Sequence, residues 1–185
     1  SVPNRPLSAL AQNEDGTQFV ILGGVNSDGS PASAVEWFTG SAEAMLDGSI
    51  TRVEGALSYQ RMGATAHMLP ESPSALVIGG TVNSSPEAYA EIVTANAASI
   101  PVTLLDAEDG SFALHASEIV ESVGCQHTLV VAGGVDLQRA DPNPPVFLSP
   151  VASRPRFQVL LLDICDPSTP TAKILDRSDA LLSDA

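Results

Sequence analysis

The chain has very few basic residues, and the only lysine is Lys173. Eight lysines and arginines stand against 22 aspartates and glutamates, which gives a formal net charge of −14. Such a charge repels phosphate backbones and anionic lipid surfaces, so we expect neither nucleic acid nor an acidic membrane as a partner. The excess of acid is typical of simple solubility, and it also suits the attraction of cations or of a basic partner.

Long hydrophobic runs and aromatic residues are also scarce. No apolar run approaches the ~20 residues of a membrane-spanning helix, so the sequence predicts no membrane insertion. Aromatic residues make up 4% of the chain and hydrophobic residues 44%, so the core must consist of alanine, valine, leucine and isoleucine. No secretory signal is visible, and the start at Ser1 rather than methionine leads us to expect a piece of a longer protein.

What the sequence does contain is a diglycine that occurs three times, each time after an apolar, β-rich run. The pairs are Gly23 and Gly24, Gly79 and Gly80, and Gly133 and Gly134. Their spacing near fifty residues indicates a repeat architecture. Paired glycine at a strand end permits positive φ and the close approach of a neighbouring chain, so we expect all six glycines to be structural.

Each repeat predicts about four strands. The predicted strands are residues 7–11, 19–22, 34–38 and 50–53, then 63–67, 75–78, 88–94 and 102–105, then 119–123, 129–132, 157–162 and 172–175. Arg5 and Arg61 each stand 18 residues before the first glycine of a pair, and the same count in the third repeat reaches His115. Residues 41–46 and 181–185 lack a sustained helical period, so we expect turns or frayed ends there.

Four antiparallel strands per repeat of ~50 residues are the blade of a β-propeller. We therefore predict an all-β fold in which 1–185 is a single propeller segment with blades at approximately 5–60, 61–114 and 115–177. Three blades form only a partial ring, because propellers have roughly four to eight. We expect the uncovered faces to meet further blades of a longer protein, a second copy in a homodimer, or another protein.

The segment 61–67, with the strand 76–78, the glycines Gly79 and Gly80, and the strand 90–92, resembles the kelch repeat family. The resemblance covers nearly the whole chain and implies a protein-binding propeller. Kelch blades usually carry a tyrosine and a tryptophan at set distances after the diglycine. Here Trp37 is the only tryptophan, and Tyr59 and Tyr89 do not fall at equivalent places. The repeats are thus closer to divergent bacterial kelch-like proteins than to animal adaptor domains.

Cys125 and Cys165 are the only cysteines. A hairpin that pairs Val131 with Val159 and Leu129 with Leu161 would place Cys125 opposite Cys165, where a disulfide is geometrically allowed. Two buried thiols acting as small hydrophobes fit the same positions, and the sequence leaves both alternatives open. A disulfide would indicate export, to an extracellular, periplasmic or cell-surface location.

No set of residues predicts a cofactor, a metal or a catalytic centre. His67, His115 and His127 are the only histidines, and they form no compact zinc motif. The acidic turns 26–29 and 106–110 do not have the spacing of a calcium loop, and ordinary turn geometry explains them. Neither a nucleophile elbow nor a phosphate-binding loop is present. Galactose oxidase-like propellers need a Tyr/His/Cys copper site, and this chain offers no recognisable set.

The proline-rich loop 136–155 departs most from the repeat, and loops on rigid scaffolds often carry function. Within and beside it, Asp141, Asn143, Arg154 and Arg156 are the predicted partner-contacting residues. The sequence thus favours a non-catalytic protein-binding or scaffold module that is exported. The alternatives are a structural subunit of a larger surface assembly, or part of a propeller enzyme whose site lies in missing blades.

Overall fold

The computed structural model describes residues 5–40, 51–70, 72–80, 86–95, 98–106, 112–139, 148–151 and 157–178. Within these residues it contains thirteen β-strands and one 3₁₀ helix, Pro86–Ala88, so the predicted all-β class is confirmed. No helix among them is long and apolar enough to cross a membrane. The expected turns or frayed ends at 41–46 and 181–185 lie outside the described residues.

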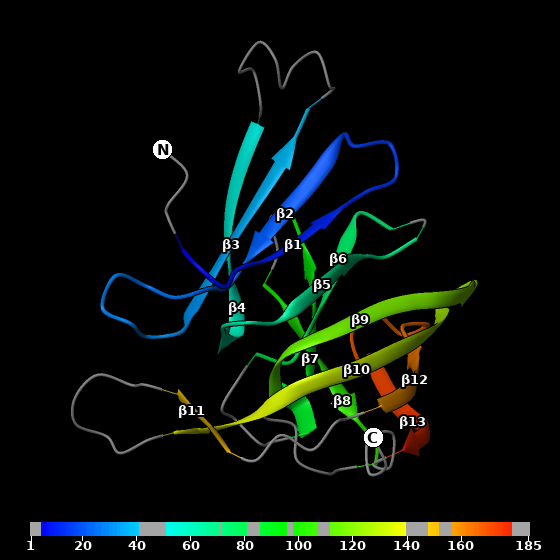
Figure 1. Cartoon of the computed structure of the whole chain (residues 1–185). Helices are drawn as coiled ribbons and strands as arrows, with labels where there is room; N and C mark the ends of the chain where they lie inside the picture. Colours follow the sequence, from blue (N-terminus) through cyan, green and yellow to red (C-terminus); the bar gives the residue numbers. More distant parts are fainter. Residues whose placement is uncertain are drawn as a thin grey trace.

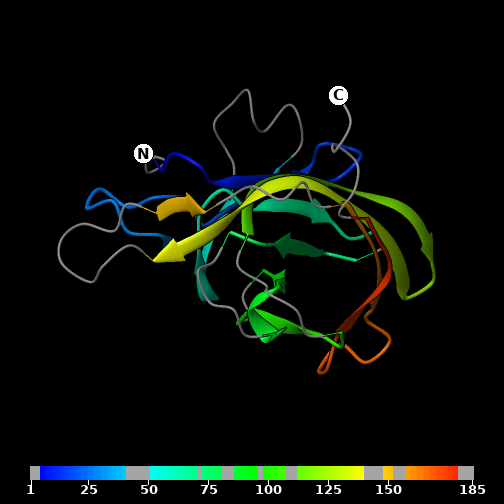
Figure 2. The same cartoon turned by 60° about the horizontal axis from the view of Figure 1, so that its bottom comes forward.

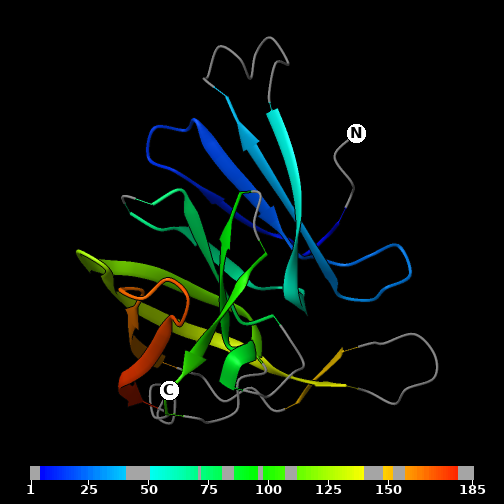
Figure 3. The ribbon, with the colours of Figure 1, turned by 180° about the vertical axis from the view of Figure 1, so that it is seen from behind.

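The first sheet is an antiparallel meander whose four strands lie in chain order (Figure 1). Its strands are β1 (Ala9–Gln12), β2 (Gln18–Leu22), β3 (Ala32–Thr39) and β4 (Thr51–Arg61). The turn before β2 is typical of a hairpin, since Asp15 accepts hydrogen bonds from the N–H and hydroxyl of Thr17, 3.0 and 2.6 Å away. Figure 3 shows this sheet from behind, beside the second one.

The second sheet has nine strands and contains two further antiparallel meanders. The second meander is β5 (Thr65–Met68), β6 (Ser74–Ile78), β7 (Ala90–Thr94) and β8 (Ile100–Leu104); the third is β9 (Phe112–Val123), β10 (Gln126–Arg139), β12 (Phe157–Asp163) and β13 (Thr171–Ser178). The short strand β11 (Leu148–Val151) pairs with the far end of β10. A parallel pairing of β8 with β13 joins the two meanders, so the sheet curves into a nearly closed barrel (Figure 2).

The two faces of each meander can be named from its diglycine. We call front the face that carries the residues two and four positions before the first glycine, and back the face that carries the residues one and three positions before it. One core cluster joins the back of the first meander, with Val20 and Leu22, to the front of the second, with Val77. The other core joins the back of the second meander to the front of the third. The meanders therefore stack back to front.

The second meander is the covered centre of this stack. All five residues of β6 are buried, as are the first four of β7, because each face of this meander packs on a neighbour. In β12 burial instead alternates with every residue, which is the pattern of a sheet covered on one face only. The number of covered faces thus explains both burial patterns: two covered faces for β6, whose residues are all buried, and one for β12, in which burial alternates.

The pairing of β10 with β12 differs by one residue from the predicted register. Leu129 pairs with Leu160 and Val131 with Gln158, in place of the expected Leu161 and Val159. The observed register puts Leu129 and Leu160 together on the buried front face, whereas a shift of one residue would turn one strand's buried set outward. The prediction was wrong because it matched two valines without asking which face each occupies.

The placement of His115 at the arginine position was also wrong. Ala9, Thr65 and Ala116 each pair with the residue just before the first glycine. Four positions before them stand Arg5, Arg61 and Phe112. The β9–β10 hairpin is longer than the other two and contains a register shift between Thr128 and Leu129. Counting 18 residues back from Gly133 therefore ends at His115, short of the equivalent position at Phe112. For the same reason β9 begins at Phe112, well before the strand expected at 119–123.

Candidate functional site

The first strands of the three meanders lie side by side. Backbone hydrogen bonds link their starts, from the N–H of Gly63 to the carbonyl of Leu7 (2.9 Å) and from the N–H of Leu114 to the carbonyl of Gly63 (2.7 Å). All three linking residues have positive φ, 61°, 63° and 56° for Leu7, Gly63 and Leu114. Leucine adopts this conformation only at a cost, of order 1–3 kcal/mol, so the junction is held by its surroundings.

A groove of about 440 Å³ opens along these first strands, toward the ends opposite to that junction. Three carboxylates line it: Glu14 from the β1–β2 turn, and Glu118 and Glu121 from β9. Between them stand two apolar side chains, Leu10 and Val120, which are 61% and 56% exposed. The groove therefore combines uncovered apolar surface with negative charge, and each of the three meanders contributes to its wall.

A chain of polar side chains connects β5 to β9 beside the groove. His115 Nε2 lies 2.8 Å from Thr65 Oγ1, which lies 2.5 Å from Ser117 Oγ, which lies 2.6 Å from His67 Nε2. These two strands are not paired by a backbone ladder, and they stand at the seam where the nine-stranded sheet nearly closes. The side chains thus join the barrel at the place where main-chain pairing is missing.

The imidazole of His67 is held in its neutral form. Burial lowers its pKa below the usual value, although the nearby charge of Glu118 acts in the opposite direction. A serine hydroxyl beside a neutral imidazole is the geometry of a nucleophile and its base. However, Ser117 does not line the groove, and its hydroxyl also contacts Thr65. We therefore assign the network a structural role at the seam.

Buried polar groups recur at one position of each meander. In each meander, the residue two places before the first glycine pairs with a buried polar residue of the neighbouring strand. These partners are Glu36, Glu91 and Gln158, and each is at most 3% exposed. Arg5 donates to Glu36 (2.7 Å) and Arg61 to Glu91 (2.8 Å). The third meander has Phe112 at the arginine position, and there the acid is replaced by Gln158, which accepts a hydrogen bond from Tyr89 Oη (3.1 Å). A neutral amide avoids burying a charge that has no cationic partner.

The six predicted glycines all have positive φ, between 62° and 99°. A Cβ placed on Gly80 would lie 2.9 Å from the carbonyl oxygen of Met62, so the close approach expected there is present.

The segment 26–29 forms a hairpin-like turn in which Asp28 accepts hydrogen bonds from the N–H and hydroxyl of Ser30. Both bonds are accepted by Oδ1, and they lower the pKa of Asp28.

Cys125 and Cys165 form a disulfide, with a Cα–Cα distance of 5.0 Å. It joins the β9–β10 turn to the loop after β12, where the N–H of Ile164 also donates to the carbonyl of Cys125 (3.0 Å). Asp163 lies close enough to both sulfurs to complete a set of three metal-binding atoms among the described residues. Because the two sulfurs are bonded to each other, neither is a thiolate ligand here.

The four predicted partner-contacting residues lie outside the described residues; they are Asp141, Asn143, Arg154 and Arg156. The groove residues were not anticipated from the sequence. A signal for the buried acids was present, because Glu36 and Glu91 stand 31 and 30 residues after Arg5 and Arg61 and each interrupts an apolar strand. For Glu118 and Glu121 no comparable signal exists, since the groove depends on how three separate strands meet.

Comparison with models of known families and with curated proteins finds no match for this chain. The kelch resemblance therefore stays a prediction that rests on the diglycine repeats.

Proposed function

We propose that this chain is a non-catalytic protein-binding module, built from three blades of an incomplete kelch-like propeller, and that its groove receives a basic, partly apolar segment of a protein partner. The observation that carries the proposal is the groove itself, in which exposed Leu10 and Val120 stand among Glu14, Glu118 and Glu121. Apolar anchors inside a charged rim are the usual composition of a recognition surface.

The propeller part of the proposal is supported by three antiparallel meanders of four strands that stack back to front with their first strands adjacent. Neighbouring blades of a propeller have this relationship. The parallel pairing of β8 with β13 draws the second and third meanders together at their last strands, and thus narrows the wedge between them. The disulfide supports export, because such bonds persist mainly in oxidising compartments.

The test is binding of a short fluorescent peptide of alternating lysine and leucine, compared with a glutamate–leucine peptide of the same length. We expect only the basic peptide to bind, and we expect its affinity to fall as salt screens the carboxylates. Glu118→Gln together with Glu121→Gln should weaken binding at least several-fold. Glu87→Gln removes the same kind of charge from an exposed site outside the groove and should have no effect.

The apolar part of the groove has its own pair of variants. Leu10→Asn removes the apolar side chain without changing the charge and should weaken binding at least several-fold, whereas Val123→Asn, at a 67% exposed position at the end of β9, should leave it unchanged. Equal binding of the basic and acidic peptides, or equal losses in the groove variants and their controls, would contradict the proposal.

A further inference from the structure

Among the described residues, the first and third meanders each have one face that no other meander covers, and the two faces are of opposite kinds. In β2 the back-face residues Val20 and Leu22 are buried, whereas Phe19 and Ile21 on the front are half-buried. The front-face residues Glu36 and Phe38 of β3 are buried against Arg5 and Phe19 of the same meander. In β10 the reverse holds, since Leu129 on the front is buried and Val130 on the back is half-buried. The stack of three therefore ends in a free front face at one side and a free back face at the other.

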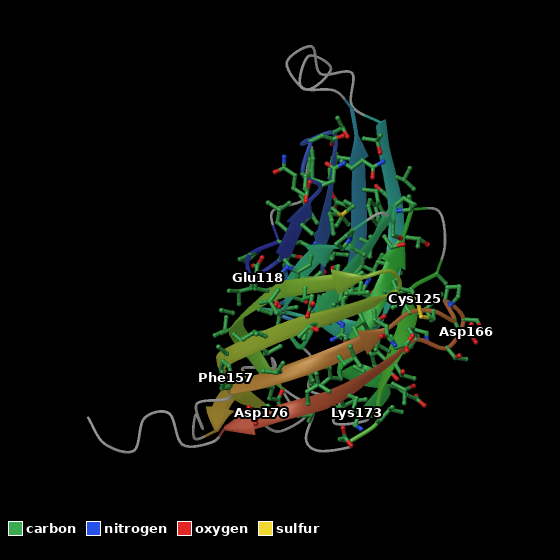
Figure 4. All side chains as sticks on the ribbon, turned by 90° about the vertical axis from the view of Figure 1, so that its right-hand side faces the viewer. Glu118, Cys125, Phe157, Asp166, Lys173 and Asp176 are labelled. Carbon is green, nitrogen blue, oxygen red and sulfur yellow. A yellow bond between two sulfur atoms is a disulfide. The ribbon has the colours of Figure 1, made fainter. Side chains whose placement is uncertain are left out.

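The free back face continues across β12. There Val159, paired with Val130, and Leu161 are half-buried, while Leu160 on the opposite side is 2% exposed. Figure 4 looks at the strands of this meander from outside, with Phe157, Lys173 and Asp176 labelled. The chain's only lysine, Lys173, lies on this face opposite Leu161. On the free front face, Glu54 pairs with Glu36 and is exposed.

Contacts at the first diglycine show what the first meander receives. The N–H of Gly24 donates to the carbonyl of Arg61 (2.8 Å), the last residue of β4, which stands four residues before the second meander. A Cβ on Gly23 would lie 2.5 Å from that same oxygen. At Gly133, the equivalent glycine of the third meander, a Cβ would meet none of the described atoms within 4 Å. The space that holds the next meander's arginine in the first junction is open at the third.

We propose that two copies of this chain associate head to tail, with the back face of each third meander packed on the front face of the other copy's first meander. The contact repeats the back-to-front packing that joins the meanders inside the chain. Arg5 is the equivalent of Arg61, so Arg5 of the second copy comes to lie beside Gly133. Both free faces are used, and the six meanders close around a two-fold axis. Leu10 and Glu118 of the groove lie on these faces, paired with Ile21 and Val130, so the second copy and a basic segment compete for them.

A second copy fits better than an unrelated protein because the two free faces occur on the same chain and match the internal junctions. Each internal junction places aliphatic side chains of one back face on one front face, as Leu76 and Ile78 meet Leu129 and Val131. The free faces offer the same kinds of residue at the same positions. The net charge of −14 opposes association at long range, so the contact should be favoured at moderate salt, where that repulsion is screened.

The experiment is the native mass by light scattering across a dilution series, at about 0.15 M salt. We expect twice the chain mass of 19.1 kDa for the unaltered protein, falling toward one chain on dilution. Ile21→Asp on the front face and Val159→Asp on the back face should each give a single-chain mass. Leu105→Asp, a matched change at a 58% exposed position just after β8 in the second meander and so on neither free face, should keep the two-chain mass. Circular dichroism and the urea midpoint show whether each variant is folded.

Mixing the two variants separates this arrangement from the others. The front variant retains an intact back face and the back variant an intact front face, so an equimolar mixture should recover a two-chain species through one intact contact. A single-chain mass for the unaltered protein would overturn the proposal. It would also be overturned if only one of the two variants lost the dimer, which indicates pairing of like faces, or if species heavier than two chains formed.

Discussion

Arg61, the last residue of β4, forms an ion pair with Glu91 of β7 in which both side chains are completely buried and Nε lies 2.8 Å from Oε1. The guanidinium also donates to the carbonyl of Ala88 (2.9 Å). The carboxylate accepts hydrogen bonds from the backbone N–H groups of Ser58 (2.6 Å) and Tyr59 (3.2 Å). The pair therefore joins the first sheet to the second, because among the described residues the guanidinium of β4 donates only to groups of the second meander and the carboxylate accepts from two N–H groups of β4.

Removal of one member of this pair should be strongly destabilising. We expect Arg61→Met to lower the free energy of unfolding by about 3–5 kcal/mol, because Glu91 is left as a buried, unpaired charge. The double variant Arg61→Met, Glu91→Gln should recover part of that loss. Arg5→Met removes the equivalent arginine at the free face, where its side chain is 9% exposed, and should cost less. Urea unfolding measures all three, and equal losses for Arg5 and Arg61 would contradict this ranking.

The repeated arginine was predicted from the sequence, whereas the acids that interrupt the apolar third strands were not paired with it. Spacing alone placed Arg5 and Arg61 at equivalent positions. Identifying Glu36 and Glu91 as their partners requires the register of the second and third strands of each meander, which a diglycine period does not specify. The same gap explains the error at His115, since counting residues cannot detect a longer hairpin.

Alanine at two equivalent glycines should have unequal effects. Gly23 and Gly133 both have positive φ, 62° and 75°, so alanine at either position is strained by about 1–2 kcal/mol. At Gly23 the added methyl also meets the Arg61 carbonyl, and we expect a further ~1–3 kcal/mol of destabilisation. Urea unfolding at low protein concentration, where single chains predominate, compares the two variants. Equal losses would mean that the Arg61 contact does not constrain Gly23.

The disulfide should make a large contribution to stability. It closes a separation of 40 residues, and the loss of a crosslink of this size costs about 2–5 kcal/mol. We expect reduction, or Cys125→Ser with Cys165→Ser, to lower the free energy of unfolding by that amount. Thiol titration with mass spectrometry checks the bond itself. Two freely titrating thiols in the unreduced native protein would show that the bond does not form.

Stability should decline on mild acidification because of His127. This side chain is 1% exposed, its Nδ1 lies 2.8 Å from Ser122 Oγ, and burial lowers its pKa below 6.5. His127 therefore binds a proton more readily in the unfolded chain than in the folded one. The contribution of the neutral imidazole to the free energy of unfolding is complete above about pH 6.5, and it is lost as the pH falls through the lower folded-state pKa. His127→Gln should flatten the dependence of unfolding free energy on pH between 7.5 and 5. An unchanged slope would contradict this assignment.

The all-β class and the positive φ of the six glycines followed from local patterns, because strand periodicity and glycine conformation are local properties. The cysteine pair was anticipated as one of two alternatives, although by a register that is wrong by one residue. The groove could not be predicted. Leu10 of β1 and Glu14 of the β1–β2 turn meet Glu118 of β9 only because the junction of Leu7, Gly63 and Leu114 sets the first strands of the meanders side by side.

The most direct test of the stacked arrangement is native-state hydrogen exchange resolved by strand. The second meander has both faces covered, so we expect the amides of β6 and β7 to exchange slowest, with opening free energies near that of global unfolding. The amides of β2 and β12, which belong to meanders with one free face, should exchange faster in the single-chain state. Protection of β2 and β12 equal to or greater than that of β6 and β7 would contradict the back-to-front stack.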